Sequence, residues 1–398
     1  MVCQHYWPEH FQITEVCEEL VHRGHDVTAL VGVPNYPTGV VPDAYQNGEN
    51  RNQIRNGVRI IRVEEAPRRP GVVGLARNYW SYMRSADRKL RDLDDEYDVI
   101  FAYQLSPVLM VEPAMRAKRM LSAPVLLYCA DIWPDAVRAM LPERLSFLMP
   151  AIQVVSTRIY KDADMVATNS RAYIDCFELV HGLDRDRCRY LPQYADDDYL
   201  DMDFSVERTE KVRFMVMGNI GKLQYLHVLM EAVDLLKERD DFELHIVGEG
   251  SAMDDLVSFV ESHNLGGHVI FHGRHPVESM PSFYCMADAC VLTLHVPGAP
   301  WISSTLPSRL QGYMAAGKPV IAAVDGSAAE VIAESGCGAS VSGTDSEGLA
   351  SLISDFIDHR EKYADCGERG RDYFRRHFMR GRYMDEIESL LIETAERK

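Results

Sequence analysis

Short apolar segments alternate with amphipathic segments through the first half of the chain. The apolar segments are rich in β-branched residues, which is typical of buried parallel strands. They are Val2–Gln4, Val27–Gly32, Arg59–Val63, Val99–Tyr103, Val125–Tyr128, Met165–Thr168 and Arg189–Leu191. Gln12–Arg23 places its apolar residues on one helical face and ends before Gly24, a residue typical of helix C-termini. Residues 107–121 and 170–180 are also expected to be helical.

This pattern stops at the acidic segment Ala195–Asp203 and restarts after it. The segment has neither helical nor strand periodicity, so we expect a linker over residues 195–208. Helices are expected between residues 223 and 236, over Ser308–Ala316 and, as one long charged helix, from Arg371 onward. The strands expected in this half are Val212–Met217, Glu243–Val247, His268–His272, Ala289–Leu294 and Lys318–Ala323.

Two consecutive series of strands and helices predict an α/β fold with two doubly wound, Rossmann-like parallel sheets. The expected domains are residues 1–194 and 209–372, and residues 373–398 form the final helix. Ligands of such sheets bind beyond the carboxyl ends of the strands, so a cleft between the domains is the expected site. The loops that follow the strands are therefore the candidate binding segments.

The charge of the chain excludes one class of function. Its 398 residues include 42 Lys and Arg against 60 Asp and Glu, a net charge of -18. This acidic excess argues against a nucleic-acid-binding protein, because such proteins neutralise phosphates with a basic surface. Residues 1–200 have a net charge of -5, and the remaining residues one of -13.

The cysteines and the hydropathy indicate a cytoplasmic protein. The nine cysteines are irregularly spaced without a C-x-x-C motif, so we expect reduced thiols and no zinc site. No apolar run approaches the roughly 18 residues of a membrane span, and no signal peptide is recognised. Attachment to a membrane surface remains open.

Several loops after the strands of the second half are candidates for phosphate binding. Gly218–Gly221 follows a strand and is expected to open a helix, with Lys222 adding a positive charge; the alternative is an ordinary tight turn. In Thr305–Pro319, Thr305 or a nearby Ser is expected to cap a helix, with Pro307 in its first turn. Ser308 and Arg309 would then offer an anion the helix N-terminus and a guanidinium. The alternative is a capped surface helix. The loops Gly248–Gly250 and His272–Pro276 would line the same crevice.

Asp131 is the candidate catalytic residue of the first half. It follows the expected strand Val125–Tyr128, where a carboxylate can orient an acceptor hydroxyl or accept its proton. A turn-initiating Asp is the equal alternative. Trp133 could stack on a sugar, although core packing is its default role.

A basic island spans Arg68–Arg91. Its net charge is +6 over 24 residues, and aromatic side chains are interleaved with the arginines. A basic amphipathic helix with aromatics in an acidic protein favours contact with anionic lipid headgroups. The alternative is a core helix with a solvated basic back.

Taken together, these motifs make the chain resemble the retaining GT-B glycosyltransferases of family four, in the branch of bacterial capsule, exopolysaccharide and O-antigen biosynthesis. The resemblance covers nearly the whole chain. Its motifs are Gln4–Glu9, Arg23–Thr28, Pro34–Gly39, Asp131–Pro134, Gly218–Lys222, Val247–Gly250, and Leu306–Arg309 continuing through Ala315–Ala322.

The resemblance implies an N-terminal acceptor-binding domain, a C-terminal donor-binding domain and a final helix that returns to the first domain. It implies retaining transfer of a hexosyl group from a UDP-sugar to a lipid-linked or glycan acceptor, such as a polyprenyl-diphosphate-linked glycan. No metal or other cofactor is expected, because amides and cations hold the diphosphate. The candidate donor-binding residues are Gly218, Asn219, Gly221, Lys222, Gly248, Glu249, Arg274, Ser304, Leu306, Pro307, Ser308 and Arg309. Those of the acceptor or membrane side are His10, Arg77, Trp80, Arg84 and Arg88.

The chain departs from the family pattern at three places. Ser304 and Gly312 stand where many relatives carry two glutamates, so the sugar and ribose contacts are not carried over. His10 and Phe11 replace a Gly-Gly pair, and Ala130 replaces a histidine, which leaves Asp131 as the nearer candidate. Two alternatives stay open: a GT-B-fold UDP-sugar epimerase using Glu9, His5 or Asp131, and a catalytically inactive binding subunit.

Overall fold

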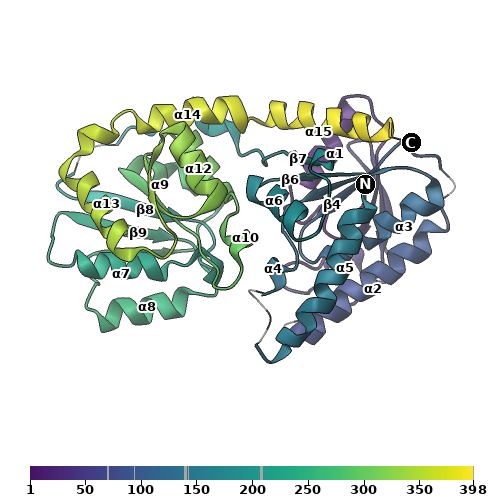
Figure 1. Ribbon diagram of the computed structural model, residues 1–398, viewed down its shortest axis with the longest axis horizontal. Coiled ribbons are helices and arrows are strands. Elements are labelled where there is room, and N and C mark those ends of the chain that lie inside the picture. The colour runs from purple at the N-terminus through teal and green to yellow at the C-terminus, as the bar shows by residue number, and fades with distance from the viewer. Residues whose placement is uncertain (70, 94, 139–140, 142, 207–208, 398) are drawn as a thin grey trace. The chain divides into compact units, whose positions relative to one another are not determined.

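The computed structural model describes residues 1–398 except 70, 94, 139–140, 142, 207–208 and 398 (Figure 1). The chain forms two compact units, one of Met1–Leu191 with Met384–Lys398 and one of Pro192–Tyr383. The first domain was predicted to end at residue 194, and the first unit ends at Leu191. The chain was predicted to return to the first domain at residue 373, and it returns to the first unit at Met384. Residues 207–208 of the expected linker and residue 398 of the expected final helix lie outside the described residues.

The sheet of the first unit is parallel except at one edge. Strands β4 to β7 pair in parallel in chain order, and β1 pairs in parallel with β3. Val2 bridges Leu30 of β1 and Ala102 of β4, so the first residues join the two groups. The strands are β1 Thr28–Gly32, β2 Asn52–Arg55, β3 Val58–Val63, β4 Ile100–Gln104, β5 Val125–Cys129, β6 Met165–Thr168 and β7 Cys188–Tyr190.

Two predictions for this sheet were wrong. The expected strand Val2–Gln4 is reduced to the bridge at Val2, because only that residue pairs with both neighbours. Strand β2 was not predicted, and it runs antiparallel to β3. Asn56 and Gly57 join these strands with φ of 46° and 84°. An Asn-Gly pair between strands is the usual signal of a tight hairpin, so this turn was readable from the sequence.

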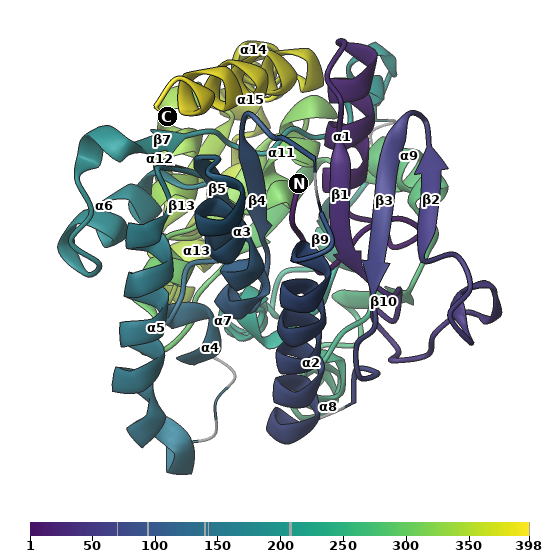
Figure 2. The ribbon, with the colours of Figure 1, turned by 90° about the vertical axis from the view of Figure 1, so that its right-hand side faces the viewer.

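Helices pack on this sheet through their apolar faces. Helix α1 buries Ile13, Val16, Cys17 and Leu20, which confirms the predicted face. The predicted helix 107–121 divides into a 3-10 turn at Val108–Val111 and helix α3, with Pro113 in the first turn of α3. Helices α2, α3 and α5 lie on one side of the strands (Figure 2). The bounds are α1 Ile13–His22, α2 Val72–Leu90, α3 Glu112–Leu121, α4 Asp135–Arg138, α5 Met149–Asp162 and α6 Arg171–Leu179.

The sheet of the second unit has the strand order β10-β9-β8-β11-β12-β13, and all its pairs are parallel. In chain order this is the 3-2-1-4-5-6 arrangement, in which ligands bind where the order reverses, between β8 and β11. The half-buried edge strand β13 was not predicted, since Gly and Ser weaken its apolar signal. The strands are β8 Val212–Met217, β9 Phe242–Val247, β10 Val269–Gly273, β11 Ala289–Thr293, β12 Val320–Ala323 and β13 Gly338–Val341.

Both faces of this sheet are covered by helices. Alternate residues of β8 belong to two separate buried clusters: Phe214 packs with side chains of α7 and α13, and Met215 with those of α11 and α14. This layering confirms the predicted doubly wound arrangement. The helices are α7 His227–Leu235, α8 Met253–Ser262, α9 Met280–Met286, α10 Pro300–Ser303, α11 Ser308–Ala315, α12 Gly326–Ser335, α13 Ser346–Asp358 and α14 Cys366–His377.

The linker and the C-terminus differ from their predictions. Asp197–Asp201 forms a 3-10 helix, because the side chain of Asp196 accepts a hydrogen bond from the Asp198 amide at 3.0 Å. The single helix expected from Arg371 onward is divided into α14 and α15 Arg380–Ala395. Within the first unit, α15 pairs with residues of the N-terminal region. Arg23 Nη1 lies 2.8 Å from both Asp385 Oδ1 and Glu388 Oε2, and His25 Nε2 lies 2.7 Å from Glu388 Oε1.

Candidate functional site

Three loops at the carboxyl ends of β8, β9 and β10 are joined by backbone hydrogen bonds. The Gly218 amide donates to the Val247 carbonyl at 2.9 Å, and the Gly248 amide to the Gly273 carbonyl at 2.8 Å. The Ile220 amide donates to the Glu249 carbonyl at 2.9 Å. The predicted segments 218–221 and 248–250, with Gly273 of the predicted loop His272–Pro276, therefore form one surface at the switch point of the sheet.

Glycine is required where these loops meet. Gly218 has φ of +112° and Gly248 has φ of +145°, which side chains with a Cβ rarely adopt. A Cβ on Gly248 would overlap the carbonyl oxygen of Gly218. Both glycines thus serve the close approach of two loops, and Gly218 is itself exposed.

Helix α11 places Arg309 over the first of these loops. Arg309 Nη2 donates to the Asn219 carbonyl at 2.7 Å, which brings together Gly218, Asn219 and Arg309 as the sequence predicted. Arg309 Nη1 is buried, and no hydrogen-bond partner for it is found among the described residues. The Arg309 side chain is half-buried beside exposed loop backbone, and its positive charge there suits an anionic ligand.

Tyr313, one turn further along α11, was missed by the sequence analysis. Its hydroxyl accepts a hydrogen bond from the Met217 amide at 3.1 Å and so anchors α11 to the end of β8. Burial raises the pKa of Tyr313 to about 12, against the opposing effect of the Arg309 guanidinium beside it. An i, i+4 tyrosine behind an expected ligand-binding arginine is the signal that could have found it.

The start of α11 differs in detail from its prediction. Pro307 is the N-cap residue rather than part of the first turn, and no side chain caps this end. The expected cap from Thr305 or a nearby Ser was wrong, because the Thr305 amide turns back to the Ile302 carbonyl at 3.3 Å in the preceding turn. Ser308 is exposed at the uncapped end, and Leu306 is buried beneath it. An uncapped helix N-terminus next to a guanidinium is favourable for an anion.

The segment after Gly218 also required correction. A 3-10 turn at Lys222–Gln224 follows it, and helix α7 begins only at His227. The Gly221 amide, expected to face a phosphate, donates to Gln224 Oε1 at 2.9 Å. Lys222 is exposed. Among the candidate donor residues, Gly221 therefore contributes a turn, whereas Lys222 remains available as a cation.

The remaining candidates of the second unit lie around this surface. Glu249 and Arg274 are exposed on the loops after β9 and β10. Ser304 ends α10, where its carbonyl accepts from the Ser327 amide at 3.1 Å. The pairing of a histidine of β9 with one of β10 was not predicted: His245 Nδ1 lies 2.9 Å from His272 Nε2. Burial lowers the pKa of both imidazoles.

In the first unit, Asp131 follows β5 at the carboxyl edge of the sheet. Burial raises the pKa of its carboxyl group, and a hydrogen bond with Ser106 opposes that change. The Asp131 carbonyl accepts from Gln104 Nε2 at 2.7 Å, which fixes the loop to the end of β4. Trp133 Nε1 donates to Ser106 Oγ at 3.2 Å, so its indole is held in the protein. A carboxyl group with a raised pKa at this edge can bind or orient a hydroxyl.

Helix α2 presents the predicted basic face to solvent. Arg77, Trp80, Arg84 and Arg88 are exposed, and the Arg84 guanidinium lies 4.7 Å from the centre of the Trp80 ring. Tyr82, Ala86 and Leu90 on the other face are buried. Among the ion pairs of the described residues, none involves Arg77, Arg84 or Arg88. His10 is also exposed, on the loop before α1.

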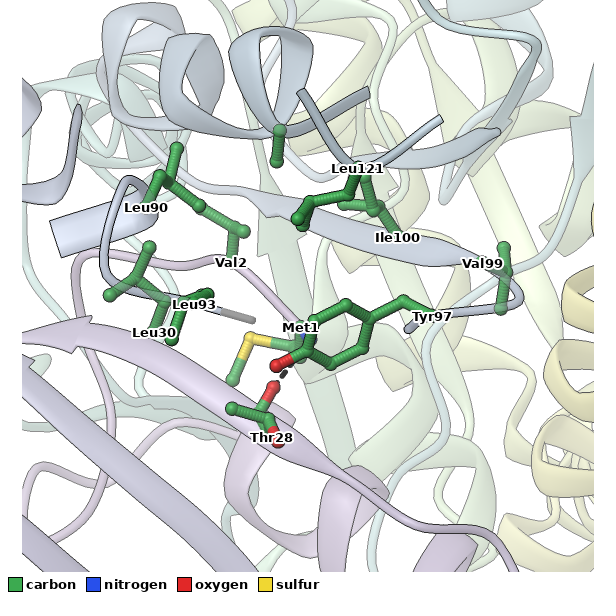
Figure 3. Close-up of a pocket in the computed structure, with 11 residues that line it drawn as sticks. Met1, Val2, Thr28, Leu30, Leu90, Leu93, Tyr97, Val99, Ile100 and Leu121 are labelled. Atoms are coloured by element: carbon green, nitrogen blue, oxygen red, sulfur yellow. Dashed lines mark hydrogen bonds between the residues drawn. The ribbon is translucent and has the colours of Figure 1, made fainter. Parts of the chain in front are cut away.

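A cavity in the first unit lies at the opposite edge of the sheet. It is lined by apolar side chains at the amino-terminal ends of β1 and β4, including Leu30, Leu90, Ile100 and Leu121 (Figure 3). Ligands of doubly wound sheets bind at the carboxyl edge, so this cavity does not belong to the candidate site.

Neither a membrane-spanning helix nor a cluster of metal ligands is found among the described residues. No described helix is long and apolar enough to cross a bilayer. Within the same residues, no group of three or more His, Cys, Asp or Glu side chains is arranged to hold a metal ion.

Two family models match the chain in succession. Residues 10–193 match the glycosyl transferase 4-like domain, and residues 200–373 match the glycosyl transferases group 1 family. Among curated proteins, the GDP-mannose-dependent alpha-(1-6)-phosphatidylinositol monomannoside mannosyltransferase of Mycolicibacterium smegmatis is 25% identical over 235 residues. These residues are 57% of this chain and 61% of that protein, so the chain matches less than two thirds of its length.

Solved structures of glycosyltransferases resemble the whole chain. Sucrose-phosphate synthase from Thermosynechococcus elongatus has a TM-score of 0.75 at 16% identity, covering 97% of this chain and 93% of the other. HepE of Anabaena in complex with UDP and glucose has a TM-score of 0.67 at 16% identity, with 98% and 97% covered. The likeness confirms the predicted GT-B fold.

Proposed function

Because residues 10–193 match the glycosyl transferase 4-like domain and residues 200–373 the group 1 glycosyl transferases, we propose that this chain transfers a sugar from a nucleotide-sugar donor to a lipid-linked or glycan acceptor. One observation carries the proposal: Arg309 and the uncapped start of α11 lie over the exposed turn at Gly218 and Asn219. This turn stands where the strand order of the second sheet reverses, the usual binding place of a nucleotide. Amides and a guanidinium are suited to a diphosphate.

The donor is a nucleoside diphosphate sugar, and UDP is our first choice for the nucleotide. The family resemblance favours a UDP-sugar, and HepE was solved with UDP and glucose. The name of the mycobacterial relative favours GDP-mannose instead. Both nucleotides bring the same diphosphate to Arg309, so the test must compare them directly.

The transfer we propose retains the configuration of the sugar. The bond between the anomeric carbon and the diphosphate oxygen breaks, and the acceptor oxygen bonds to the same face of that carbon. The acceptor proton passes to the departing phosphate, whose charge Arg309 and the α11 N-terminus stabilise. Asp131 orients the acceptor hydroxyl. No metal is needed in this scheme.

The acceptor we propose is anchored in a membrane, as in capsule, exopolysaccharide or O-antigen synthesis. The mycobacterial relative is named for a phosphatidylinositol-linked acceptor. The exposed face of α2, with Arg77, Trp80, Arg84 and Arg88, would hold the protein on the inner, anionic leaflet. A polyprenyl-diphosphate-linked glycan would then be within reach.

A thermal-shift screen of nucleotide sugars tests the donor, because a ligand that binds the folded state raises its stability by mass action. We expect UDP-sugars to raise the midpoint of unfolding more than UMP does. GDP-sugars are measured beside them, because GDP-mannose is the alternative donor. Proton NMR of the best donor, with and without membrane extract, then follows its fate, because it distinguishes epimeric sugars of equal mass. Turnover without any acceptor would indicate the epimerase instead. Binding without turnover in either mixture would indicate an inactive subunit.

The membrane contact is tested by sedimentation with vesicles that contain phosphatidylglycerol. Replacing Arg77, Arg84 and Arg88 together by Glu should abolish sedimentation, because each basic residue near such a surface contributes about 1 kcal/mol. Replacing Arg185, Arg375 and Arg376 by Glu is the matched control, since these arginines lie outside α2. Equal sedimentation of the two variants would contradict the membrane contact.

A further inference from the structure

The loop of residues 4–11 lies at the switch point of the first sheet and belongs neither to the proposed donor site nor to the surroundings described for Asp131. Residues 1–3 lie between β1 and β4, and Val2 bridges both strands. The strand order of the unit therefore reverses at this segment, and the loop of residues 4–11 leaves the sheet there. In doubly wound sheets this is the usual place of a ligand.

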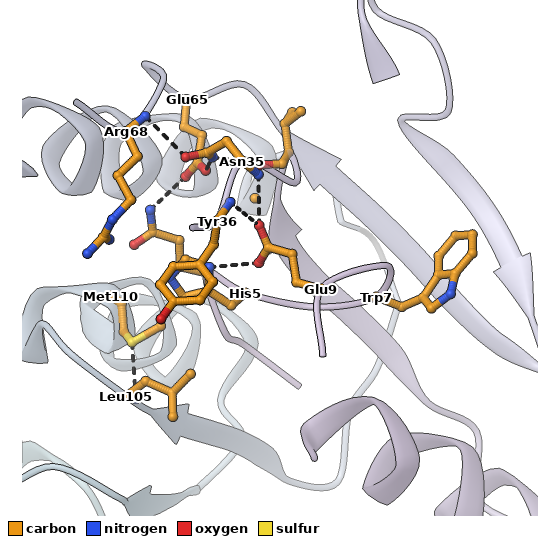
Figure 4. Close-up of polar contacts among 12 residues, drawn as sticks. His5, Trp7, Glu9, Asn35, Tyr36, Glu65, Arg68, Leu105 and Met110 are labelled. Atoms are coloured by element: carbon orange, nitrogen blue, oxygen red, sulfur yellow. Dashed lines mark hydrogen bonds and ion pairs between the residues drawn. The ribbon is translucent and has the colours of Figure 1, made fainter. Parts of the chain in front are cut away.

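A buried carboxylate ties this loop to the loop after β1. Glu9 Oε1 accepts hydrogen bonds from the amides of Asn35 and Tyr36, both at 2.7 Å. Glu9 Oε2 lies 2.8 Å from His5 Nδ1 (Figure 4). The Glu9 side chain is only 5% exposed. A buried carboxylate needs such donors, and here they fix the backbone of residues 35 and 36.

A second set of contacts adds the loop after β3. Asn35 Oδ1 accepts from the Arg68 amide at 3.1 Å, and Asn35 Nδ2 donates to Glu65 Oε1. Gln4 Nε2 donates to Glu65 Oε2 at 2.8 Å. Three loops, around residues 4–9, 35–36 and 65–68, are thus held together by the enclosed side chains of Gln4, Glu9 and Asn35 and by the half-buried Glu65.

The outer surface of these loops is aromatic and cationic. Tyr36 is 45% exposed, although its amide is fixed from below. Its ring centre lies 5.3 Å from those of both His5 and Phe11, and the Arg68 guanidinium lies 5.3 Å from it. Trp7 of the same loop points away from this group (Figure 4).

Arg68 retains capacity for an anion. Its Nη1 donates to the Tyr79 hydroxyl at 3.1 Å, and the ion pairs of the described residues do not include it. An exposed aromatic face binds the apolar side of a pyranose ring, and a guanidinium beside it binds phosphate. Because buried hydrogen bonds already fix the backbone of Tyr36, little ordering of the loop is needed on binding.

We propose that Tyr36, Phe11 and Arg68 form the subsite for the phosphate-bearing sugar of the lipid-linked acceptor. The inference rests on the proposed function, which supplies the acceptor, but it uses only residues of the first unit. Tyr36 stacks on the sugar ring, and Arg68 binds the phosphate group attached to it in the lipid linkage. Glu9 is a positioning residue, since it acts through the backbone of Asn35 and Tyr36.

Saturation-transfer NMR on the full chain tests this subsite. The probes are glucose 1-phosphate, its octyl phosphodiester and methyl glucoside, each with saturating UDP or GDP to occupy the donor site. We expect ring-proton signals from both phosphorylated probes. The signals should fall about tenfold in Tyr36→Ala, which removes the stacking surface, and persist in Tyr36→Phe. Arg68→Gln should reduce both phosphorylated probes to the level of methyl glucoside.

Arg309→Ala is the control for residual binding at the donor site, and it should leave these signals unchanged. Equal signals in wild type and Tyr36→Ala would overturn the inference, as would the absence of signals in the wild type. Binding of glucose 1-phosphate without its octyl diester would overturn the lipid-linked assignment. Calorimetry with UDP and GDP on the same samples separates a failure of this inference from a failure of the proposed function. If nucleotide binds but Tyr36→Ala has no effect on the probes, the inference is contradicted and the proposed function stands.

Discussion

The carboxyl edges of the two sheets are built in different ways. In the second unit, backbone amides and carbonyls of glycine-containing turns join the loops, and the added side chain is the cation Arg309. In the first unit, the enclosed side chains of Glu9, Asn35 and Glu65 join the loops. A diphosphate is attracted by the uncapped N-terminus of α11 and by a guanidinium, and it is repelled by carboxylates. The difference indicates that the second edge is suited to the donor diphosphate, and the first to an acceptor whose sugar hydroxyls lie there and whose phosphate is bound by Arg68.

The net charges of the two halves of the chain differ in the opposite direction: the half that contains the proposed anion site is the more acidic one. Residues 201–398 carry a net charge of -13, whereas residues 1–200 carry -5. Most of those acidic groups are solvated and screened beyond about 10 Å, so the local amides and Arg309 decide anion binding. Net charge by half is therefore a poor guide to the ligand of each unit.

The largest effect is expected where the backbone itself makes the contact. Gly248→Ala places a Cβ against the Gly218 carbonyl at a φ of +145°, so the two loops must separate. We expect stability to fall by about 1–3 kcal/mol and nucleotide binding to be lost. Chemical denaturation and calorimetry measure the two. Gly267→Ala, which has no neighbour within 4 Å of the added Cβ, should match the wild type.

The next effect is expected in the first unit and is confined to stability and acceptor transfer. Glu9→Ala leaves the Asn35 and Tyr36 amides without their acceptor, which should reduce stability by about 1–3 kcal/mol. Transfer to the acceptor should be lost, but nucleotide affinity should stay unchanged, because Glu9 belongs to the other edge. Glu49→Ala, an exposed residue of the same unit, is the control. A parallel loss of nucleotide affinity would contradict the separation of the two edges.

The pH dependence of stability is expected to show the smallest effect. Burial, with a contribution from the nearby Glu9 charge, raises the pKa of Glu65 well above its ordinary value of 4.5. Since the folded state then binds more protons than the unfolded state, this contribution is complete below pH 4.5 and is lost as the pH rises through the folded-state pKa.

Glu65→Gln removes that dependence, because an amide does not ionise in this range. The substitution lowers the free energy of unfolding by the same amount at every pH, so the informative quantity is the slope of this free energy against pH. Urea denaturation between pH 4.5 and pH 9 should show the wild type losing stability relative to Glu65→Gln as the pH increases. Parallel curves would show that Glu65 is ionised in the folded protein.

The two edges also differ in how far the sequence predicts them. Gly218, Gly248 and Arg309 could be grouped in advance, because loops after neighbouring parallel strands must meet at one edge. The contacts of Glu9 with Asn35 and Tyr36 could not, since they join separate loops through side chains. The Gly221 amide was expected to bind a ligand, but it donates a hydrogen bond to the Gln224 side chain. The spacing of residues alone does not reveal that this side chain takes the place of the ligand. The hairpin at Asn56-Gly57 was not predicted, although an Asn-Gly pair is a known sequence signal of such a turn.

The assignment of Arg309 to a nucleotide diphosphate is the central claim. Isothermal titration calorimetry of UDP and GDP against wild type and Arg309→Ala tests it most directly, with Arg375→Ala on the exposed face of α14 as the control. Loss of a charged hydrogen-bonding partner should weaken the preferred nucleotide by about 1.5–3 kcal/mol, roughly ten- to a hundredfold in Kd. The control should bind as the wild type does. Equal affinity of Arg309→Ala and wild type for both nucleotides would contradict the account.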